Sequence, residues 1–365
     1  MRLLIQGMGV VGGFGCGTDA LASALSSGHC APRNASVKTS QGPLDIAVFF
    51  ADASRLEEFV NKRSLRRVDH FSKMAILGSY LALQDAGKLE EDRSRMGMII
   101  ATGYGAARTT YTLLDSFVLD GETFASPTSF SNSVHNAAVA GVSTLLDITG
   151  PGLTVSQFEM SVASALITAR CWLEEGSVDS VLFGAVDEYC DVLGYCWHRF
   201  FGERATSAHD MDPFNLDLQS AVPGEGASFF VLSRDDGGGS QYGCIENAHL
   251  GMVEQYTEGP DGDNTIFFIG ADGHRECGAH YKRFLSGHSR TACYTPLYGS
   301  LPTGPAFDIA IAALSIKSGK VFPSPVKNKG PGNGADNEGR LPDSGSICCV
   351  KISNRGELGT VTLKA

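Results

Sequence analysis

The amino-acid sequence predicts an α/β fold made of two consecutive halves, in which short buried strands alternate with helices. Apolar runs of strand length, such as 96–101, alternate with segments of helical periodicity, such as 68–87. A polar, glycine-rich run at 235–240 separates a first half, 1–234, from a second half, 241–365. We therefore expect strand–helix repeats on both sides of a short linker.

In the first half, the strand expected at 2–6 is followed by a glycine-rich turn over 7–15. The segment 68–87 has apolar residues at helical spacing and ends at Gly87, which is typical of a helix C-cap. The other elements expected here are a strand at 96–101, helices at 109–118 and 138–146, and strands at 178–186 and 229–232.

The second half is expected to begin with a strand at 244–247. Its segment 325–345 is rich in Gly, Asn, Asp and Pro, a composition that indicates a mobile loop. The remaining elements are a strand at 266–270, a helix at 306–318 and a pair of strands at 347–352 and 360–364. In the first strand of that pair, Cys348 and Cys349 should point to opposite faces of the sheet.

Composition excludes several classes of function. The 365 residues, 43% of them hydrophobic, can form a large core, and a net charge of −11 argues against a nucleic-acid surface. The first six residues resemble a strand rather than a signal peptide, and no apolar run approaches the roughly 20 residues that span a bilayer. We therefore expect a cytoplasmic protein without a membrane partner, whose ten cysteines are reduced thiols.

Two patterns suggest a cofactor or a metal, and both are weak. Gly7 to Gly12 matches the dinucleotide fingerprint G-x-G-x-x-G, but no strand ending in an acidic residue follows at 28–35. A nicotinamide-dependent oxidoreductase therefore stays only as an alternative to a plain glycine-rich turn. Cys190, Cys196 and His198 do not have the spacing of a zinc site. We expect no cofactor and no metal.

The most informative segment is 150–166, G-P-G-L-T-V-S-Q-F-E-M-S-V-A-S-A-L, which reads as strand, sharp turn and helix. It resembles the nucleophile elbow of the β-ketoacyl synthases, condensing enzymes of the thiolase-like fold. The resemblance covers nearly the whole chain, most strongly from about 65 to 233, with a shortened second half. It implies two tandem βαβαβ-type halves in a layered αβαβα core. The family carries a cysteine at the N-terminus of the elbow helix, where this chain has Glu159.

The resemblance also implies two histidines, a lysine and a glycine-rich gating loop, and each is missing at its expected place. Asp272 occupies the position of the first histidine, with His274 two residues later. Gly299 is the best match for the second histidine, in a register uncertain by one residue, and no histidine follows His288. No lysine lies between 282 and 317, and 353–358 replaces the gating loop. A carboxylate cannot carry the acyl thioester that the family's thiolate carries.

Such a chain resembles the chain-length factor of type II polyketide synthases, in which glutamine commonly replaces the cysteine. That resemblance implies a non-catalytic subunit that pairs with an active ketosynthase, as a heterodimer or within a higher assembly, and meets an acyl carrier protein through the complex. The product would be an aromatic polyketide or a polyene. The alternative is a malonyl-carrier-protein decarboxylase that uses Glu159 with Asp272 as a pair of carboxylates.

The resemblance places the wall of the partner's acyl tunnel in the segment 103–114. Four residues there would share one face of a helix that begins this early, unless they are plain core: Tyr104, Ala107, Tyr111 and Leu114. The segment 126–136 resembles the part that reaches across the dimer, and its candidate interface residues are Ser129, Phe130, Ser133 and His135. We interpret His135 as a hydrogen-bonded interface or core residue, not as a base.

Overall fold

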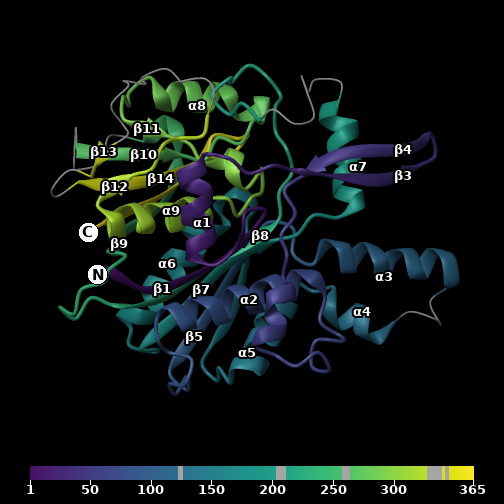
Figure 1. The fold of residues 1–365 in the computed structure, drawn as a ribbon, viewed down its shortest axis with the longest axis horizontal. Coiled ribbons are helices and arrows are strands. Elements are labelled where there is room, and N and C mark those ends of the chain that lie inside the picture. Colours follow the sequence, from purple (N-terminus) through teal and green to yellow (C-terminus); the bar gives the residue numbers. More distant parts are fainter. Residues whose placement is uncertain (122–125, 203–210, 257–263, 327–338, 342–344) are drawn as a thin grey trace.

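An eleven-stranded mixed sheet organises the computed structural model, which describes the chain except for residues 122–125, 203–210, 257–263, 327–338 and 342–344. Its strands follow the order β11-β10-β14-β15-β9-β1-β8-β7-β5-β6, and β2 pairs with β1. The first strand, β1, pairs with both β8 and β9, so strands from before and after the 235–240 linker join in one sheet (Figure 1).

The helices lie in layers around this sheet. Helices α2 and α5 pack on the outer face of β1, β8, β7 and β5, and α8 packs on the outer side of the C-terminal strands. Helices α6 and α9 lie between two groups of strands, the N-terminal group β1, β5, β7 and β8 and the C-terminal group β9, β10, β14 and β15. They share one large apolar core with both groups. This arrangement is the αβαβα layering expected from the sequence (Figure 1).

Up to the linker, the helices and strands have these bounds: β1 Leu3–Gly12, β2 Gly15–Cys16, α1 Thr18–Ser27, β3 Arg33–Thr39, β4 Gly42–Val48, α2 His70–Asp85, β5 Met96–Thr102, α3 Ala107–Asp120, α4 Pro127–Asn132, α5 Ala137–Leu146, β6 Gly152–Ser156, α6 Ser161–Glu174, β7 Ser180–Asp187, α7 Asp191–Phe201 and β8 Gly226–Arg234. After it follow β9 Cys244–Met252, β10 Thr265–Ile269, α8 Gly278–Leu285, β11 Thr291–Ala292, α9 Pro305–Ser318, β12 Lys320–Val321, β13 Gly339–Arg340, β14 Ser346–Ile352 and β15 Glu357–Lys364.

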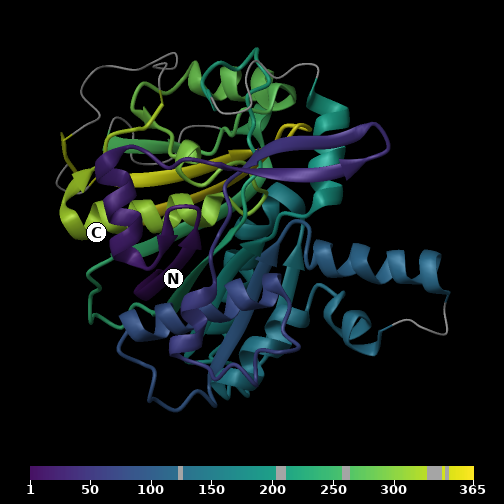
Figure 2. The same cartoon turned by 45° about the vertical axis from the view of Figure 1, so that its right-hand side comes forward.

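Most expected elements are confirmed with ends moved by a few residues, and α2 shows why. Asp69 accepts a hydrogen bond from Ser72 N at 2.7 Å and caps the start of the helix. Gly87, with a φ of +68°, ends it in the left-handed conformation that favours glycine. The β3–β4 hairpin and α7 were not expected from the sequence, and they extend from the body on the same side as α3 (Figure 2).

The glycines near the N-terminus correct one expectation. The turn expected over 7–15 is confined to Gly13 and Phe14, between β1 and β2, because Gly7 and Gly9 lie inside β1, where α2 crosses the sheet at close range. A Cβ atom at Gly9 would overlap the carbonyl oxygen of Gly78 in α2. The G-x-G-x-x-G pattern therefore serves strand–helix packing, and the dinucleotide interpretation of it is wrong.

Three further expectations concern cysteines, metals and membranes. The ten cysteines are free thiols, and Cys348 and Cys349 are buried in different core clusters, on opposite faces of β14 as expected. Within the described ranges, no group of three or more His, Cys, Asp or Glu side chains is arranged to hold a metal ion. None of the described helices is long and apolar enough to cross a bilayer. Most of the loop expected at 325–345 lies outside the described residues.

Candidate functional site

The elbow is formed as the sequence predicts. Strand β6 ends at Ser156, a short 3-10 turn covers Phe158–Met160, and α6 follows directly. Phe158 has a φ of +45°, an uncommon conformation for a residue with a side chain. This turn places Glu159, which is half-buried, at the N-terminal end of α6, where the helix dipole stabilises a carboxylate.

The elbow is fastened to the end of β5 through one serine hydroxyl. Ser161 Oγ accepts a hydrogen bond from Gln157 N at 2.7 Å and donates to the carbonyl of Thr102 at 2.9 Å. Ser161 is fully buried, so both bonds are shielded from water. The strained backbone at the turn is thus held by the adjacent strand rather than by contacts of Glu159.

Facing the elbow region lies a buried ion pair. Lys351 Nζ, from β14, lies 2.7 Å from Asp272 Oδ2 and also donates to the carbonyl of Gly270 at 3.0 Å. Ser300 Oγ donates to the same Asp272 oxygen at 2.7 Å. All three side chains are less than a tenth exposed. The expected first histidine position is therefore taken by a carboxylate that already has two close donors.

The two charges of this pair stabilise each other. Burial alone would raise the pKa of Asp272, but the Lys351 charge, together with His274 and the hydrogen bonds from Lys351 and Ser300, brings that pKa below its ordinary value. Burial alone would lower the pKa of Lys351, but Asp272 raises it above its ordinary value, and Glu159 adds to this effect. Asp272 and Lys351 are therefore both ionised at neutral pH, and the paired carboxylates of the decarboxylase alternative are not what the site presents.

At the second expected histidine position, the structure distinguishes Gly299 from the residue that follows it. Gly299 has a φ of +83°, and a Cβ atom there would lie 2.7 Å from the ring of Phe49 and 2.9 Å from the Gly224 backbone. A side chain at 299 would therefore be strained and would meet its neighbours. Its successor, Ser300, is the residue whose side chain reaches Asp272.

His274 packs in an aromatic cluster beside Asp272. Its ring packs edge-on against Trp197 and Phe201 of α7, with ring centroids 4.8 and 5.0 Å apart. Burial lowers the pKa of His274, although the neighbouring Asp272 charge partly opposes this. The ring is therefore held by an aromatic cluster, with Gln219 Nε2 at 3.4 Å from its Nδ1.

The candidate tunnel residues divide into two groups. Tyr104 lies before α3 and not on it, and its ring packs edge-on against Phe158 of the elbow, with ring centroids 6.1 Å apart. Burial, and then the charges of Asp187, Glu159 and Asp272, raise the pKa of the Tyr104 phenol. The expectation that all four share one helix face is therefore wrong for Tyr104. The other three lie on α3 and become more exposed along it: Ala107 is buried, Tyr111 half-buried and Leu114 50% exposed.

The candidate interface residues lie on α4 and directly after it, against α3. Ser126 caps α4 by accepting from Ser129 N, and the carbonyl of Ser133 accepts from Thr110 Oγ1 of α3 at 2.9 Å. Phe130 is 64% exposed. His135 is also exposed rather than part of the core, and its ring lies so close to Gly105 that a Cβ atom there would overlap it.

Sequence reasoning missed three residues of this site: Lys351, Ser300 and Asp187. Asp187, at the end of β7, accepts on one oxygen from Thr102 Oγ1 and the backbone N–H groups of 103 and 104, and on the other from Thr303. It thus joins the end of β5 to the segment before α9. Only Lys351 left a usable signal, because it is the single charged residue in the otherwise apolar or small run 346–352.

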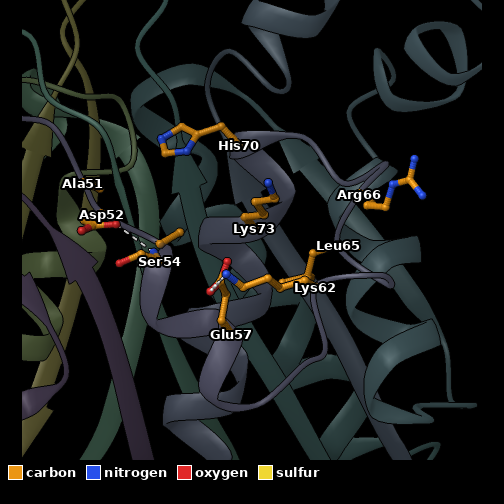
Figure 3. A pocket seen from close by; sticks show the side chains of 10 residues that line it. Ala51, Asp52, Ser54, Glu57, Lys62, Leu65, Arg66, His70 and Lys73 are labelled. Atoms are coloured by element: carbon orange, nitrogen blue, oxygen red, sulfur yellow. Dashed lines mark hydrogen bonds and ion pairs between the residues drawn. The ribbon is translucent and has the colours of Figure 1, made fainter.

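A separate concave surface lies at the start of α2, and no residue of the elbow lines it (Figure 3). It has a volume of about 380 Å³, and Lys62 within it pairs with Glu57 at 3.0 Å. An adjoining hollow of about 410 Å³ is lined by Arg63, Ser64, Arg66 and Arg67. The mostly exposed stretch 62–67 therefore carries four basic residues on a chain whose net charge is −11. Ten residues line the first hollow: Ala51, Asp52, Ala53, Ser54, Glu57, Lys62, Leu65, Arg66, His70 and Lys73.

Comparison with known proteins agrees with this geometry. Residues 2–237 match the family model "Beta-ketoacyl synthase, N-terminal domain". A 3-oxoacyl-[acyl-carrier-protein] synthase 2 of Rhizobium meliloti is 27% identical over 252 residues, 63% of this chain and 58% of the relative. The actinorhodin polyketide putative β-ketoacyl synthase 1 of Streptomyces coelicolor is 28% identical over 250 residues, 64% of this chain and 53% of the relative.

The matched part of the chain spans less than two thirds of the length of these two curated relatives. A solved structure described as the ishigamide ketosynthase/chain length factor superposes with a TM-score of 0.77, covering 100% of this chain and 99% of that one at 17% identity. At that identity the likeness concerns the fold alone, which is the thiolase-like fold of ketosynthases.

Proposed function

The chain belongs to the β-ketoacyl synthase family, and on that basis we propose that it is the non-catalytic, chain-length-determining subunit of a type II polyketide synthase. It would pair with an active ketosynthase and shape the acyl tunnel of that partner, for an aromatic polyketide or a polyene. The observation that supports this proposal most is the Asp272–Lys351 ion pair, because the sequence resemblance aligns Asp272 with a histidine that would serve condensation as a neutral hydrogen-bond donor.

The chemistry of condensation explains why this observation matters. Acyl transfer needs a nucleophile that can form a thioester, and Glu159 offers only a carboxylate. Stabilising a developing enolate needs donors aimed at its oxygen, each worth on the order of 10²–10³ in rate. Ser300 and Lys351 are donors, but both are bound to Asp272, whose negative charge would repel an enolate.

An exposed apolar surface supports pairing with a second subunit. It runs over α3, α4 and the elbow, and its large side chains are between 38% and 83% exposed. Surfaces of this kind mark interaction sites, because monomeric proteins rarely leave them uncovered. Strand β6 ends the sheet beside this surface, so its outer edge is available for further pairing. The residues of this surface are Leu114, Phe117, Val118, Leu119, Phe130, Val134, Leu153 and Phe158.

The choice of a ketosynthase as partner rests on which residues form this surface, because they include the elbow and α3. Phe158 of the elbow is 58% exposed and contacts Tyr104, so the surface begins at the candidate site and continues along α3. A partner bound here would have its own acyl chain close to α3. Tyr111 and Leu114, which share one face of that helix, would then limit the length of that chain.

A second contact would be with an acyl carrier protein that serves the complex. The basic stretch 62–67 offers an electropositive surface suited to an acidic carrier, and exposed arginines favour such steering. This stretch adjoins α4, because Asn132 Nδ2 donates to the carbonyl of Arg67 at 2.7 Å. A carrier bound here would therefore lie beside the partner subunit that covers the apolar surface.

Co-expression with a cysteine-bearing ketosynthase tests the proposal. We expect a stable one-to-one complex that elongates malonyl units, whereas the isolated chain should elongate none. Products should be measured by mass spectrometry for the complex and for each subunit alone. Chain elongation by this polypeptide without a partner would refute the proposed role.

A further inference from the structure

The start of α3 is held by a residue from elsewhere in the chain. Helix N-termini leave several backbone N–H groups without partners, and Ala106 at the cap of α3 has no side chain able to accept one. The backbone N–H of Arg108 instead donates to Glu188 Oε1 at 2.9 Å. Glu188 directly follows β7, so a distant part of the core caps this helix.

The side chain of Arg108 also binds the segment after β7 that contains Glu188. Its guanidinium donates to the carbonyl of Tyr189 at 2.7 Å and lies 3.9 Å from the Glu225 carboxylate. Glu225 in turn accepts from Tyr189 N at 3.0 Å, and its other oxygen lies 2.9 Å from His70 Nε2. The first turn of α3 is thus bound to the core through both the backbone and the side chain of one residue.

Glu188 is unusual among the members of this network. It is 2% exposed, and its second oxygen, Oε2, is buried without a hydrogen-bond partner in the structure. An unpartnered, buried carboxylate oxygen is costly while it carries charge, but can hold a proton. Burial raises the pKa of Glu188 to about 7, although the Arg108 N–H and the Arg108 charge oppose this.

Beyond its first turns, α3 leaves the body of the molecule (Figure 2). Its later residues Phe117, Val118 and Leu119 are 40%, 83% and 79% exposed. Among the described helices and strands, α4 and α7 are the main neighbours of α3. The direction of α3 therefore depends on how its first turn is attached.

We propose that Glu188 is a positioning residue that, through Arg108, sets the direction of α3 and thereby the length of acyl chain accepted beside it. The second part of this statement rests on the proposed function, whereas the first concerns the isolated chain. Protonated Glu188 keeps Oε1 as an acceptor for Arg108 N and places its proton on the otherwise unpartnered Oε2. Ionised Glu188 is stable only when the first turn opens and water reaches the carboxylate.

The sign of the pH dependence follows from this difference. An attached α3 binds the Glu188 proton more tightly than an opened one, so attachment is favoured at low pH and is lost as pH rises through about 7. The other charged or titratable groups around Glu188 are Arg108 on α3, Asp69 and His70 at the start of α2, Tyr189, Cys190, and Glu225 before β8. With an ordinary glutamate pKa in the opened state, the opening equilibrium should rise roughly tenfold between pH 6 and pH 8.

Hydrogen exchange of residues 107–120, corrected for the intrinsic effect of pH, measures this opening in the isolated chain. Wild type should open about tenfold more at pH 8 than at pH 6. Glu188→Gln resembles the protonated acid and should stay attached at both pH values. Glu188→Leu removes the hydrogen-bond acceptor of Arg108 N, so the first turn of α3 should open at both pH values. His70→Gln should retain most of the wild-type pH dependence, because His70 is bound to Glu225 and its charge affects the pKa of Glu188 less than burial and Arg108 do.

Arg95→Ala is the matched control, since it breaks an exposed ion pair with Asp179 (2.7 Å) and should not change exchange at α3. A tenfold pH effect that survives in Glu188→Gln would overturn the anchoring role, and this result remains available if Glu188→Leu does not fold.

In the reconstituted complex, Glu188→Leu should broaden the distribution of product lengths at pH 6, while Glu188→Gln keeps the wild-type length. Unchanged products with Glu188→Leu would overturn the effect on chain length. Failure of wild type to pair with a ketosynthase would contradict only the proposed function, because exchange in the isolated chain does not depend on it.

Discussion

Lys351 Nζ lies 2.7 Å from Asp272 Oδ2, and each side chain is less than a tenth exposed. The two residues are 79 positions apart in the chain, and Asp272 is the residue that the sequence resemblance aligns with the first histidine of the family. A buried pair of this kind is stable only while both partners are present, because a single buried charge has no compensation.

Removing one partner of this ion pair should therefore destabilise the fold. We expect Asp272→Asn to lower the free energy of unfolding by about 3–5 kcal/mol, since Lys351 would remain buried and uncompensated. The double variant Asp272→Asn with Lys351→Met should lie much closer to wild type. Urea unfolding of the four proteins gives the coupling energy. Equal and additive losses from the two single changes would show that the pair is not coupled.

The Asp272–Lys351 pair also predicts how the free energy of unfolding depends on pH in the acidic range. Because the pKa of Asp272 is lower in the fold than in the unfolded chain, its contribution is present above the unfolded value of 3.8 and is lost as pH falls through the lower, folded value. Wild type should thus lose stability more steeply below pH 4 than the Asp272→Asn variant. Unfolding free energies between pH 2 and pH 6 measure this, and parallel curves would contradict it.

Restoring the nucleophile alone should not restore condensation. In Glu159→Cys, a thiol would stand at the N-terminus of α6 and should react with iodoacetamide. Elongation should still be absent, because Asp272, Ser300 and Lys351 remain bound to one another. Intact-protein mass spectrometry after incubation with an acyl donor and malonyl-carrier protein tests both points. Detection of an elongated thioester on the introduced thiol would disprove this expectation.

A charge on the exposed face of α3 should weaken pairing with the ketosynthase. Val118 is 83% exposed, and an aspartate there would have to lose its water in an apolar interface. We expect Val118→Asp to weaken the complex at least about tenfold without changing the stability of the isolated chain. Ala279→Asp, on the exposed part of α8, is the matched control. Size-exclusion chromatography over a concentration series would reveal the difference, and equal affinities would place the interface elsewhere.

Tyr111 should act on product length rather than on pairing. It is half-buried on α3, one helical turn from Ala107, and its replacement by alanine would enlarge a pocket bounded by that face. We expect longer products from a complex that contains Tyr111→Ala, with little change in the amount of complex. Mass spectrometry of the products decides this, and an unchanged distribution would exclude Tyr111 from the tunnel wall.

The local chemistry of the chain determined much of this protein. Apolar runs predicted the buried strands, apolar residues at helical spacing before Gly87 predicted α2, and the segment 150–166 predicted the elbow with Glu159 at its turn. The absence of histidine after His288 was also readable without a structure. These features depend on residues close together in the chain, where spacing and turn preferences carry the information.

Only the tertiary structure decided which distant residues meet. It placed Gly7 and Gly9 against α2, brought Ser300 rather than Gly299 to Asp272, and joined Lys351 to that carboxylate. It likewise showed Glu188 capping α3 from 80 positions away. Such contacts follow from how the sheet orders its strands and how helices pack on it, and no local periodicity encodes a pairing between side chains so far apart in sequence.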